Sequence, residues 1–239
     1  LLDTGADVNT IDNDGCSPLH DCAAKDLGIM LSMLLPHHWN AEVQDNEGYT
    51  ALHYAVSNRK IKTAMILLEH GVNMDAADRH GRTPLHYGAN GGMDDMVDLL
   101  CRNDCKVDDE DEEGDTALHG AALAGHADTV KMLLQFGANP DIQNHRGCQP
   151  AHLASEAGEL QVVKELVAYD CDMNRKNYAG RTPLGEARLN GHTGIVMFVK
   201  EKYATFTVAE VAKLEKREVG MSREARLALE REKREMDAG

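Results

Sequence analysis

The amino-acid sequence predicts an all-α fold of stacked repeats, an α-solenoid in which short helices alternate with short β-hairpin loops. Two regularities support this fold class. Three residue types recur at a fixed spacing of 33, and each 33-residue unit holds the apolar periodicity of two short helices. Aromatic residues make up only 4% of the chain, which argues against one large barrel or sandwich core and favours small units that share a core by stacking.

Three series of residues in one phase define the repeat. The glycines are Gly15, Gly48, Gly81, Gly114, Gly147 and Gly180, the histidines are His20, His53, His86, His119 and His152, and the acidic series Asp12, Asp45, Asp78 and Asp111 continues as Asn144 and Asn177. This phase predicts full repeats over residues 12–44, 45–77, 78–110, 111–143 and 144–176, a sixth over 177–201, and the end of a truncated repeat over 1–11.

Each unit is predicted to contain two helices and a hairpin. In the unit around Gly114, a first helix runs from Thr116 through Leu123, and a second covers 127–135 with apolar residues at i, i+3 and i+4. Other first helices are expected to begin with an N-cap followed by proline, at Pro18, Pro84, Pro150 and Pro183. A left-handed residue is expected at the end of each second helix, at Gly5, His38, Gly71, Asp104, Gly137 and Asp170.

The residues around each hairpin form a signature. From Asp78 the chain reads Asp-Arg-His-Gly-Arg-Thr-Pro-Leu-His-Tyr-Gly, and the segments that start at Asp45 and Asp111 keep the same framework. This pattern resembles the D-x-x-G-x-T-P-L-H-x-A signature of the ankyrin-repeat family, over roughly residues 1–200. The resemblance implies an ankyrin-repeat α-solenoid whose hairpin tips and first helices line a concave groove for a protein partner.

Two repeats depart from the signature. Gly185 replaces the histidine in the last repeat, which a terminal unit without a downstream neighbour tolerates, and Asp26-Leu27 replaces the helix-breaking Gly-His in the repeat 12–44. Trp39 stands where the other units have smaller residues. It either fills a local gap or protrudes, and we expect packing.

The 33-residue period ends near residue 202, so residues 202–239 form a separate tail. Thr207 and Glu210 have the spacing of a capping box that opens an amphipathic stretch, and Ser222 is placed to cap a second helix that reaches Met236. The tail is therefore predicted to be helical. Residues 203–219 are expected to cap the last repeat, whereas 222–239 fit a solvated helix and a docking helix for another subunit equally well.

Charge and composition restrict the partners. Lys and Arg total 25 against 40 Asp and Glu, and the net charge of −15 at pH 7 makes nucleic acid a poor partner. No window of 18 uncharged apolar residues occurs, so membrane insertion is not expected. Six cysteines without a C-x-x-C pair favour a reduced, intracellular and cytoplasmic location. The chain starts without Met or a signal pattern, which fits a piece of a longer protein or a subunit of a larger assembly.

Catalytic, cofactor and metal sites are not predicted. The five signature histidines recur too regularly for catalysis, and each can bond a hydroxyl at the start of its helix and a backbone group of the adjacent hairpin. The pair His37-His38 lacks spaced partners for a metal. The acidic run 108–115 fails as a calcium loop, because Gly120 occupies the position that needs a bidentate glutamate. No phosphate-binding loop, nucleophile elbow or H-E-x-x-H motif occurs.

One modification pattern is present. Asn9 and Asn174 each follow an Asp-hydrophobic pair and lie eight residues after a leucine. This arrangement is similar to the ankyrin motif that asparaginyl hydroxylases accept, so both residues are candidates for hydroxylation. The alternative, which we favour, is that each asparagine stabilises its hairpin.

The hairpin tips are the positions that vary from repeat to repeat, so they are the candidate partner-binding residues. These are Asn46, Glu47, Tyr49, Arg79, His80, Arg82, Glu112, Glu113, Asp115, His145, Arg146, Tyr178 and Arg181. Along the stack they alternate in charge, which favours a folded or helical protein partner over a polyanion. The alternative is pairing within the solenoid, of Arg79 or Arg82 with Glu112 or Glu113.

Two functions fit these features. The first is a non-catalytic scaffold for protein–protein interaction. The second is a regulatory or substrate-recruiting segment of a larger enzyme or channel, because the chain begins inside a predicted helix and carries no chemistry of its own. The two differ in what lies before Leu1.

Overall fold

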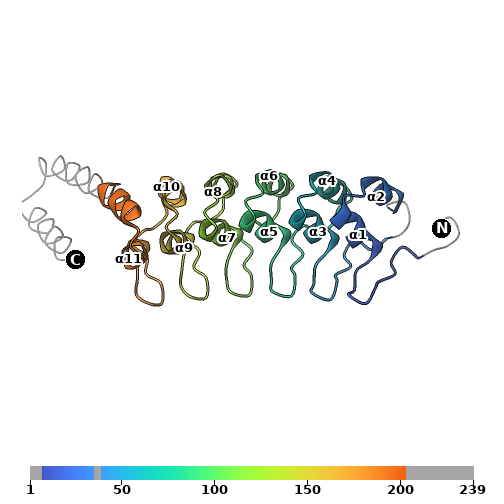
Figure 1. Cartoon of the computed structure of the whole chain (residues 1–239), viewed down its shortest axis with the longest axis horizontal. Coiled ribbons are helices and arrows are strands. Elements are labelled where there is room, and N and C mark those ends of the chain that lie inside the picture. The colour runs from blue at the N-terminus through green and yellow to red at the C-terminus, as the bar shows by residue number, and fades with distance from the viewer. Residues whose placement is uncertain (1–6, 35–38, 203–239) are drawn as a thin grey trace, which may run out of the picture. The chain divides into compact units, whose positions relative to one another are not determined.

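The computed structural model describes residues 7–34 and 39–202 (Figure 1). Its helices are α1 Pro18–Lys25, α2 Gly28–Leu34, α3 Ala51–Ser57, α4 Ile61–Glu69, α5 Pro84–Asn90, α6 Asp94–Arg102, α7 Ala117–Leu123, α8 Ala127–Gln135, α9 Pro150–Ala157, α10 Leu160–Ala168 and α11 Pro183–Leu189. Residues 193–202 are also helical. The prediction of an all-α solenoid is confirmed. Within the described ranges, extended pairing is limited to one isolated bridge between Glu110 and Thr116, so the hairpin loops are turns rather than strands.

The chain divides into two compact units, Leu1–Ile195 and Val196–Gly239. In the first unit, the odd-numbered first helices form one row and the even-numbered second helices another (Figure 1). From α1 to α9, each first helix packs against the first helix of the next repeat and against the second helix of its own. The hairpin loops extend from the row of first helices, away from the second helices (Figure 1).

The core of this unit runs from repeat to repeat between the two rows. Each first helix of three successive repeats buries one leucine fully, namely Leu52, Leu85 and Leu118, and the second helices bury Leu67, Leu100, Leu133 and Leu166. Alanines such as Ala55 and Ala121 fill the space between neighbouring helices. Each repeat is too short to enclose such a core alone, so the core exists because neighbours share it.

The helix boundaries follow the sequence signals. Thr116 caps α7 in an extended conformation, and proline starts α1, α5, α9 and α11. Left-handed backbone follows the second helices at Gly71, Asp104, Gly137 and Asp170, as predicted, while Gly5 and His38 lie outside the described residues. In the divergent first repeat, Asp26 takes the left-handed conformation at φ 56°, which Arg59 adopts in the second repeat and glycine supplies in the later ones.

Several sequence features fall at the margins of this description. Trp39 is half-buried, which agrees better with packing than with protrusion into solvent. The pair His37-His38, the capping box of Thr207 and Glu210, and the helix predicted from Ser222 lie outside the described residues. Over residues 7–34 and 39–202, every helix is too short or too polar to cross a lipid bilayer.

Candidate protein-binding surface

The acidic residue at the start of each hairpin folds the tip. Oδ1 of Asp78 accepts the backbone N–H groups of His80 and Arg82 at 2.8 and 2.9 Å, and Gly81 closes the turn at φ 76°. Asn144 makes the equivalent bonds with its amide oxygen. Asp and Asn are thus interchangeable at this position, because the turn needs only the side-chain oxygen.

Neighbouring tips are joined by a backbone ladder. The N–H of Arg79 donates to the carbonyl of Glu47 at 3.0 Å, and the N–H of Glu112 donates to the carbonyl of His80 at 2.9 Å. The same step continues through Asn46, His145 and Tyr178. This close approach explains the glycine series: a Cβ on Gly48 would lie 2.7 Å from the nitrogen of Arg79, and one on Gly81 would lie 3.0 Å from that of Glu112.

The signature histidines join each first helix to the following hairpin, as predicted. In α5, Nδ1 of His86 accepts the N–H of Thr83 at 3.1 Å and lies 2.9 Å from its hydroxyl. Nε2 lies 3.0 Å from the carbonyl of Asp115, which can only accept, so the Nε2 proton is fixed. Equivalent bonds hold His20, His53, His119 and His152, with Gln149 replacing the hydroxyl residue before His152.

A third set of bonds, not foreseen from the sequence, ties the bases of the hairpins together. Oδ1 of Asn9 accepts the N–H of Asn40 at 2.7 Å, and Oδ1 of Asp75 accepts the N–H of Lys106 at 3.0 Å. Asp108 and Asp141 repeat the contact 31 residues on. The side chain of Asn9 therefore links its hairpin to the hairpin of the next repeat. Asn174, the other candidate for hydroxylation, is exposed, and its N–H donates to Asp172.

We define the tip surface as hairpin residues 46–49, 79–82, 112–115, 145–148 and 178–181, with Tyr54, Tyr87, Gly120 and Leu123 of the first helices. Most predicted partner-binding residues are exposed on it: Asn46, Glu47, Arg79, His80, Glu112, Glu113, His145, Arg146, Tyr178 and Arg181. Tyr49, Arg82 and Asp115 are half-buried. Among the aromatic residues within 7–34 and 39–202, Tyr178 is the most open, with 79% of its surface accessible.

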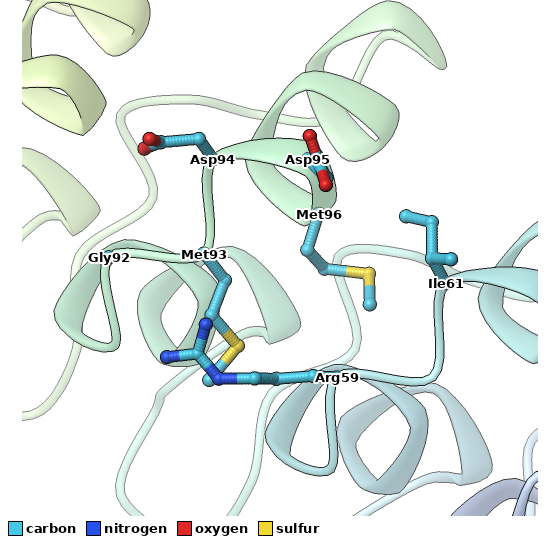
Figure 2. Close-up of a pocket in the computed structure, with 7 residues that line it drawn as sticks. All are labelled: Arg59, Ile61, Gly92, Met93, Asp94, Asp95 and Met96. Carbon is cyan, nitrogen blue, oxygen red and sulfur yellow. The ribbon is translucent and has the colours of Figure 1, made fainter.

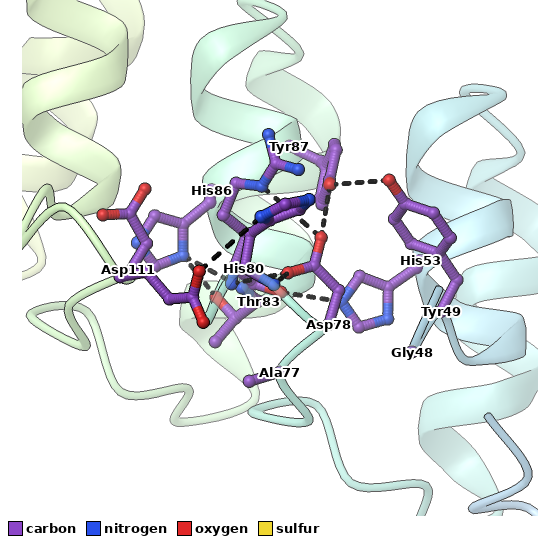
Figure 3. Close-up of polar contacts among 12 residues, drawn as sticks. Gly48, Tyr49, His53, Ala77, Asp78, His80, Thr83, His86, Tyr87 and Asp111 are labelled. Atoms are coloured by element: carbon purple, nitrogen blue, oxygen red, sulfur yellow. Dashed lines mark hydrogen bonds and ion pairs between the residues drawn. The ribbon is translucent and has the colours of Figure 1, made fainter. Parts of the chain in front are cut away.

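The ion pairs at the tips differ from the alternative considered above. Arg79 pairs with Glu47 of the preceding repeat at 3.8 Å, and Arg82 pairs with Asp78 of its own hairpin at 3.4 Å. His80, rather than an arginine, faces Glu112, at 3.7 Å (Figure 3). The backbone ladder causes this arrangement, because it sets Arg79 directly beside Glu47.

Arg181 is held at the last hairpin. Its Nε donates to Oε1 of the buried Glu186 at 2.8 Å, and this hydrogen bond raises the pKa of Arg181 above its usual value. Asn177 donates to the same oxygen at 2.7 Å. Glu186 thus orders the end of the repeat array, where Gly185 provides no histidine.

An aromatic cluster occupies the first-helix part of the tip surface. The hydroxyls of Tyr49 and Tyr87 lie 3.0 Å apart, and the hydroxyl of Tyr87 donates to Oδ2 of Asp78 at 2.6 Å (Figure 3). Tyr54 donates to Asp45 in the same way at 2.8 Å. Burial, reinforced by these hydrogen bonds, raises the pKa of Tyr54 and Tyr87 well above its usual value. With His53, the three tyrosines line a hollow of about 240 Å³.

Sequence reasoning missed Tyr54 and Tyr87, although a signal was available. Tyrosine directly follows the signature histidine in both of these repeats, whereas Gly120 and Leu153 take that place in the next two. At Gly120 the surface is hollowed by about 180 Å³, between Tyr87, Arg82, Leu123, Asp111 and Asp115. Leu123 is 48% exposed beside this second hollow.

A third hollow, of about 380 Å³, lies where α4 and α6 begin and contains none of the predicted site residues (Figure 2). Two of its charged side chains make hydrogen bonds between repeats. Arg59 donates to the carbonyl of Gly91 at 2.8 Å, and Asp94 accepts the hydroxyl of Thr129. Over the described ranges, no group of His, Cys, Asp and Glu side chains could hold a metal ion, and all six cysteines are free thiols.

Comparison with known proteins agrees with this architecture. A family model that describes ankyrin repeats in three copies matches residues 1–78, 23–111, 71–144 and 118–209. No curated protein matches the chain significantly.

Proposed function

Because the chain belongs to the ankyrin-repeat family, we propose that it is a non-catalytic scaffold that binds a protein partner through its tip surface, the concave side of the array in this proposal. Ankyrin repeats generally mediate protein–protein interactions. The observation that carries the proposal is a division of labour within each repeat. The Asp or Asn, Gly and His series make the recurring scaffold bonds, while the tip side chains at 46–47, 79–80, 112–113, 145–146 and 178–179 differ from unit to unit.

The chemistry of the variable residues favours a protein partner. Three arginines of the tip surface already have carboxylate partners: Arg79 with Glu47, Arg82 with Asp78 and Arg181 with Glu186. The chain as a whole has a net charge of −15, so a polyanion would be repelled. Tyrosine and arginine carry much of the binding energy in protein interfaces, and the tip surface presents both.

The two hollows on either side of Tyr87 give the surface relief. One is lined by Tyr49, Tyr54 and Tyr87, and the other contains the exposed side chain of Leu123. Specific interfaces place side chains of one partner in pockets of the other, surrounded by polar residues. The combination supports recognition of an individual protein rather than general adhesion.

Photo-crosslinking tests the placement of the interface. Benzoylphenylalanine is introduced at Leu123 or Tyr178 on the tip surface, and at the exposed Lys131 or Lys164 on second helices as matched controls. After irradiation in a native extract, we expect discrete protein adducts from the first two positions and none from the controls. Adducts formed only from Lys131 and Lys164 would place the binding surface on the second helices and contradict the proposal.

A further inference from the structure

The carboxylate of Asp111 has one oxygen without a partner among the described residues. Its Oδ1 accepts the N–H groups of Glu113 and Asp115 at 3.0 and 2.9 Å, as every hairpin turn requires. In the two preceding repeats the other oxygen accepts a tyrosine hydroxyl, from Tyr54 or Tyr87. Residue 120 is the equivalent position here, and it is glycine.

The missing tyrosine also creates the second hollow, which we name the Gly120 hollow. Ala117 and Gly120 supply small residues, the ring of Tyr87 and the side chain of Leu123 are apolar, and Asp111 and Asp115 add carboxylates. An apolar lining with charge at one side suits a long cationic side chain, whose methylene groups pack while its charged end remains polar.

The charges around the Gly120 hollow leave it negative. Arg82 is the one cation in its lining, and it is neutralised by Asp78 at 3.4 Å and lies over the Tyr87 ring at 5.2 Å. Burial lowers the pKa of the lining residue His86, so this histidine is neutral near pH 7. The lining carboxylates Asp111 and Asp115 are part of the acidic run 108–115, which contains seven carboxylates. Of these seven, only Glu112 has an ion-pair partner among the described residues.

From this geometry we propose that the Gly120 hollow receives an arginine or lysine side chain from the partner protein. The inference rests on the proposed function and specifies it: the partner's contact segment is basic. The methylene groups of the incoming residue pack against Tyr87 and Leu123, and its charged end bonds the vacant oxygen of Asp111 together with Asp115. Hydrogen bonds between charged groups in a site shielded from water are stronger than those at an open surface.

The probe is a random dodecapeptide library displayed on phage and selected against the full chain. Individual selected peptides are then synthesised with a fluorescent label, and their dissociation constants are measured by fluorescence polarisation. We expect selection to enrich arginine or lysine at one fixed position. Replacing an arginine there with citrulline, its neutral isostere, should weaken binding by about tenfold or more.

Two variants of the protein separate charge from shape. Asp111→Asn with Asp115→Asn removes two charges and keeps the turn oxygens, because asparagine naturally fills the Asp111 position in the next two repeats as Asn144 and Asn177. Gly120→Tyr fills the hollow without backbone strain, since the atoms nearest to a Cβ there, all of Asn90, lie 3.5 Å away or more. The matched control, Asp109→Asn with Glu110→Gln, removes two charges from residues that do not line the hollow.

Loss of about tenfold in affinity in both test variants, with less than about threefold in the control, supports the inference. An equal loss of affinity in the test and control variants would mean that the carboxylates act only by long-range attraction, which would overturn the inference. Peptides that bind the tip surface without a basic residue, or that retain affinity for Gly120→Tyr, would also overturn it while leaving the proposed function intact. Peptides whose binding is weakened only by Lys131→Glu with Lys164→Glu would contradict both the inference and the proposed function. Circular dichroism and thermal unfolding confirm that each variant is folded.

Discussion

The hydroxyl of Tyr87 donates a 2.6 Å hydrogen bond to Oδ2 of Asp78, and so joins a first helix to the hairpin nine residues before it. Burial alone would raise the pKa of Asp78, but this bond, with those from the N–H groups of Arg82 and His80, holds the pKa below its usual value. The carboxylate thus organises the turn and the helix together.

We expect Tyr87→Phe to lower the free energy of unfolding by about 1.5–3 kcal/mol, which is typical of a hydrogen bond to a charged group. Tyr178→Phe is the matched control and should change it by less than about 0.5 kcal/mol, because Tyr178 is an exposed surface residue. Urea titration of the three proteins measures the effect. Equal stability of Tyr87→Phe and the wild type would show that the bond contributes nothing net.

The buried histidines predict loss of stability in mild acid. Burial lowers the pKa of His53, His86, His119 and His152. The unfolded chain therefore binds more protons than the folded one, and stability is full above the unfolded pKa of about 6.5 and falls as the pH drops below it. We expect the thermal midpoint to decrease steadily from about pH 7.5 to about pH 5, and less steeply in His86→Gln. A midpoint that rises over this range would contradict the assignment of neutral histidines.

Two glycines with the same backbone conformation should respond differently to substitution. Gly81 and Gly137 have φ angles of 76° and 90°, yet a Cβ at Gly81 would lie 3.0 Å from the backbone of Glu112, while one at Gly137 meets nothing within 4 Å. Gly137→Asn should cost about 1 kcal/mol from the backbone alone. Gly81→Asn should cost more, and Gly81→Val most, because a β-branched side chain tolerates positive φ poorly. Equal losses for Gly81→Asn and Gly137→Asn, measured by urea titration, would mean that the neighbouring hairpin yields freely.

The buried Glu186 should control the order of the last described hairpin. Glu186→Ala removes the carboxylate acceptor of the buried Asn177, whose amide then keeps only Cys148 Sγ at 3.6 Å, and removes the partner of Arg181, so we expect a loss of about 1.5–3 kcal/mol. Glu186→Gln retains an acceptor oxygen and should cost about half as much. Amide hydrogen exchange of α11 measures the local effect. Protection of α11 that is unchanged in Glu186→Ala would show that other contacts hold the end of the array.

The fold could be predicted from the sequence because each structural role is repeated. The position of His86 appears in five units, and each copy makes the same bond to the next hairpin, so the spacing alone identified the role. The third set of bonds is harder to recognise, because its series begins with Asn9 and Glu42 and is aspartate only from Asp75 onwards. All its members share a side-chain oxygen that accepts an N–H group.

The candidate surface was predictable only in part. Variation at the tips identified the exposed residues, but it did not show that Tyr54 and Tyr87 reach back to the hairpins, because their partners are nine residues away in sequence. The alternative, pairing of Arg79 or Arg82 with the following repeat, does not occur: Arg79 pairs with the preceding repeat and Arg82 with its own hairpin. The direction of the Arg79 pair depends on which way the backbone ladder runs, which the repeat spacing does not reveal.

The backbone ladder has a consequence for how such an array changes in length over evolutionary time. Each tip donates one N–H to the tip before it and offers one carbonyl to the tip after it, so the two ends of any 33-residue unit are complementary. Duplication or deletion of one whole unit restores the same bond at the new junction, whereas a change of any other length leaves a donor and an acceptor unmatched. The unit by which the array can lengthen or shorten is therefore one complete repeat, and duplication of a repeat extends the surface without any change to the scaffold bonds.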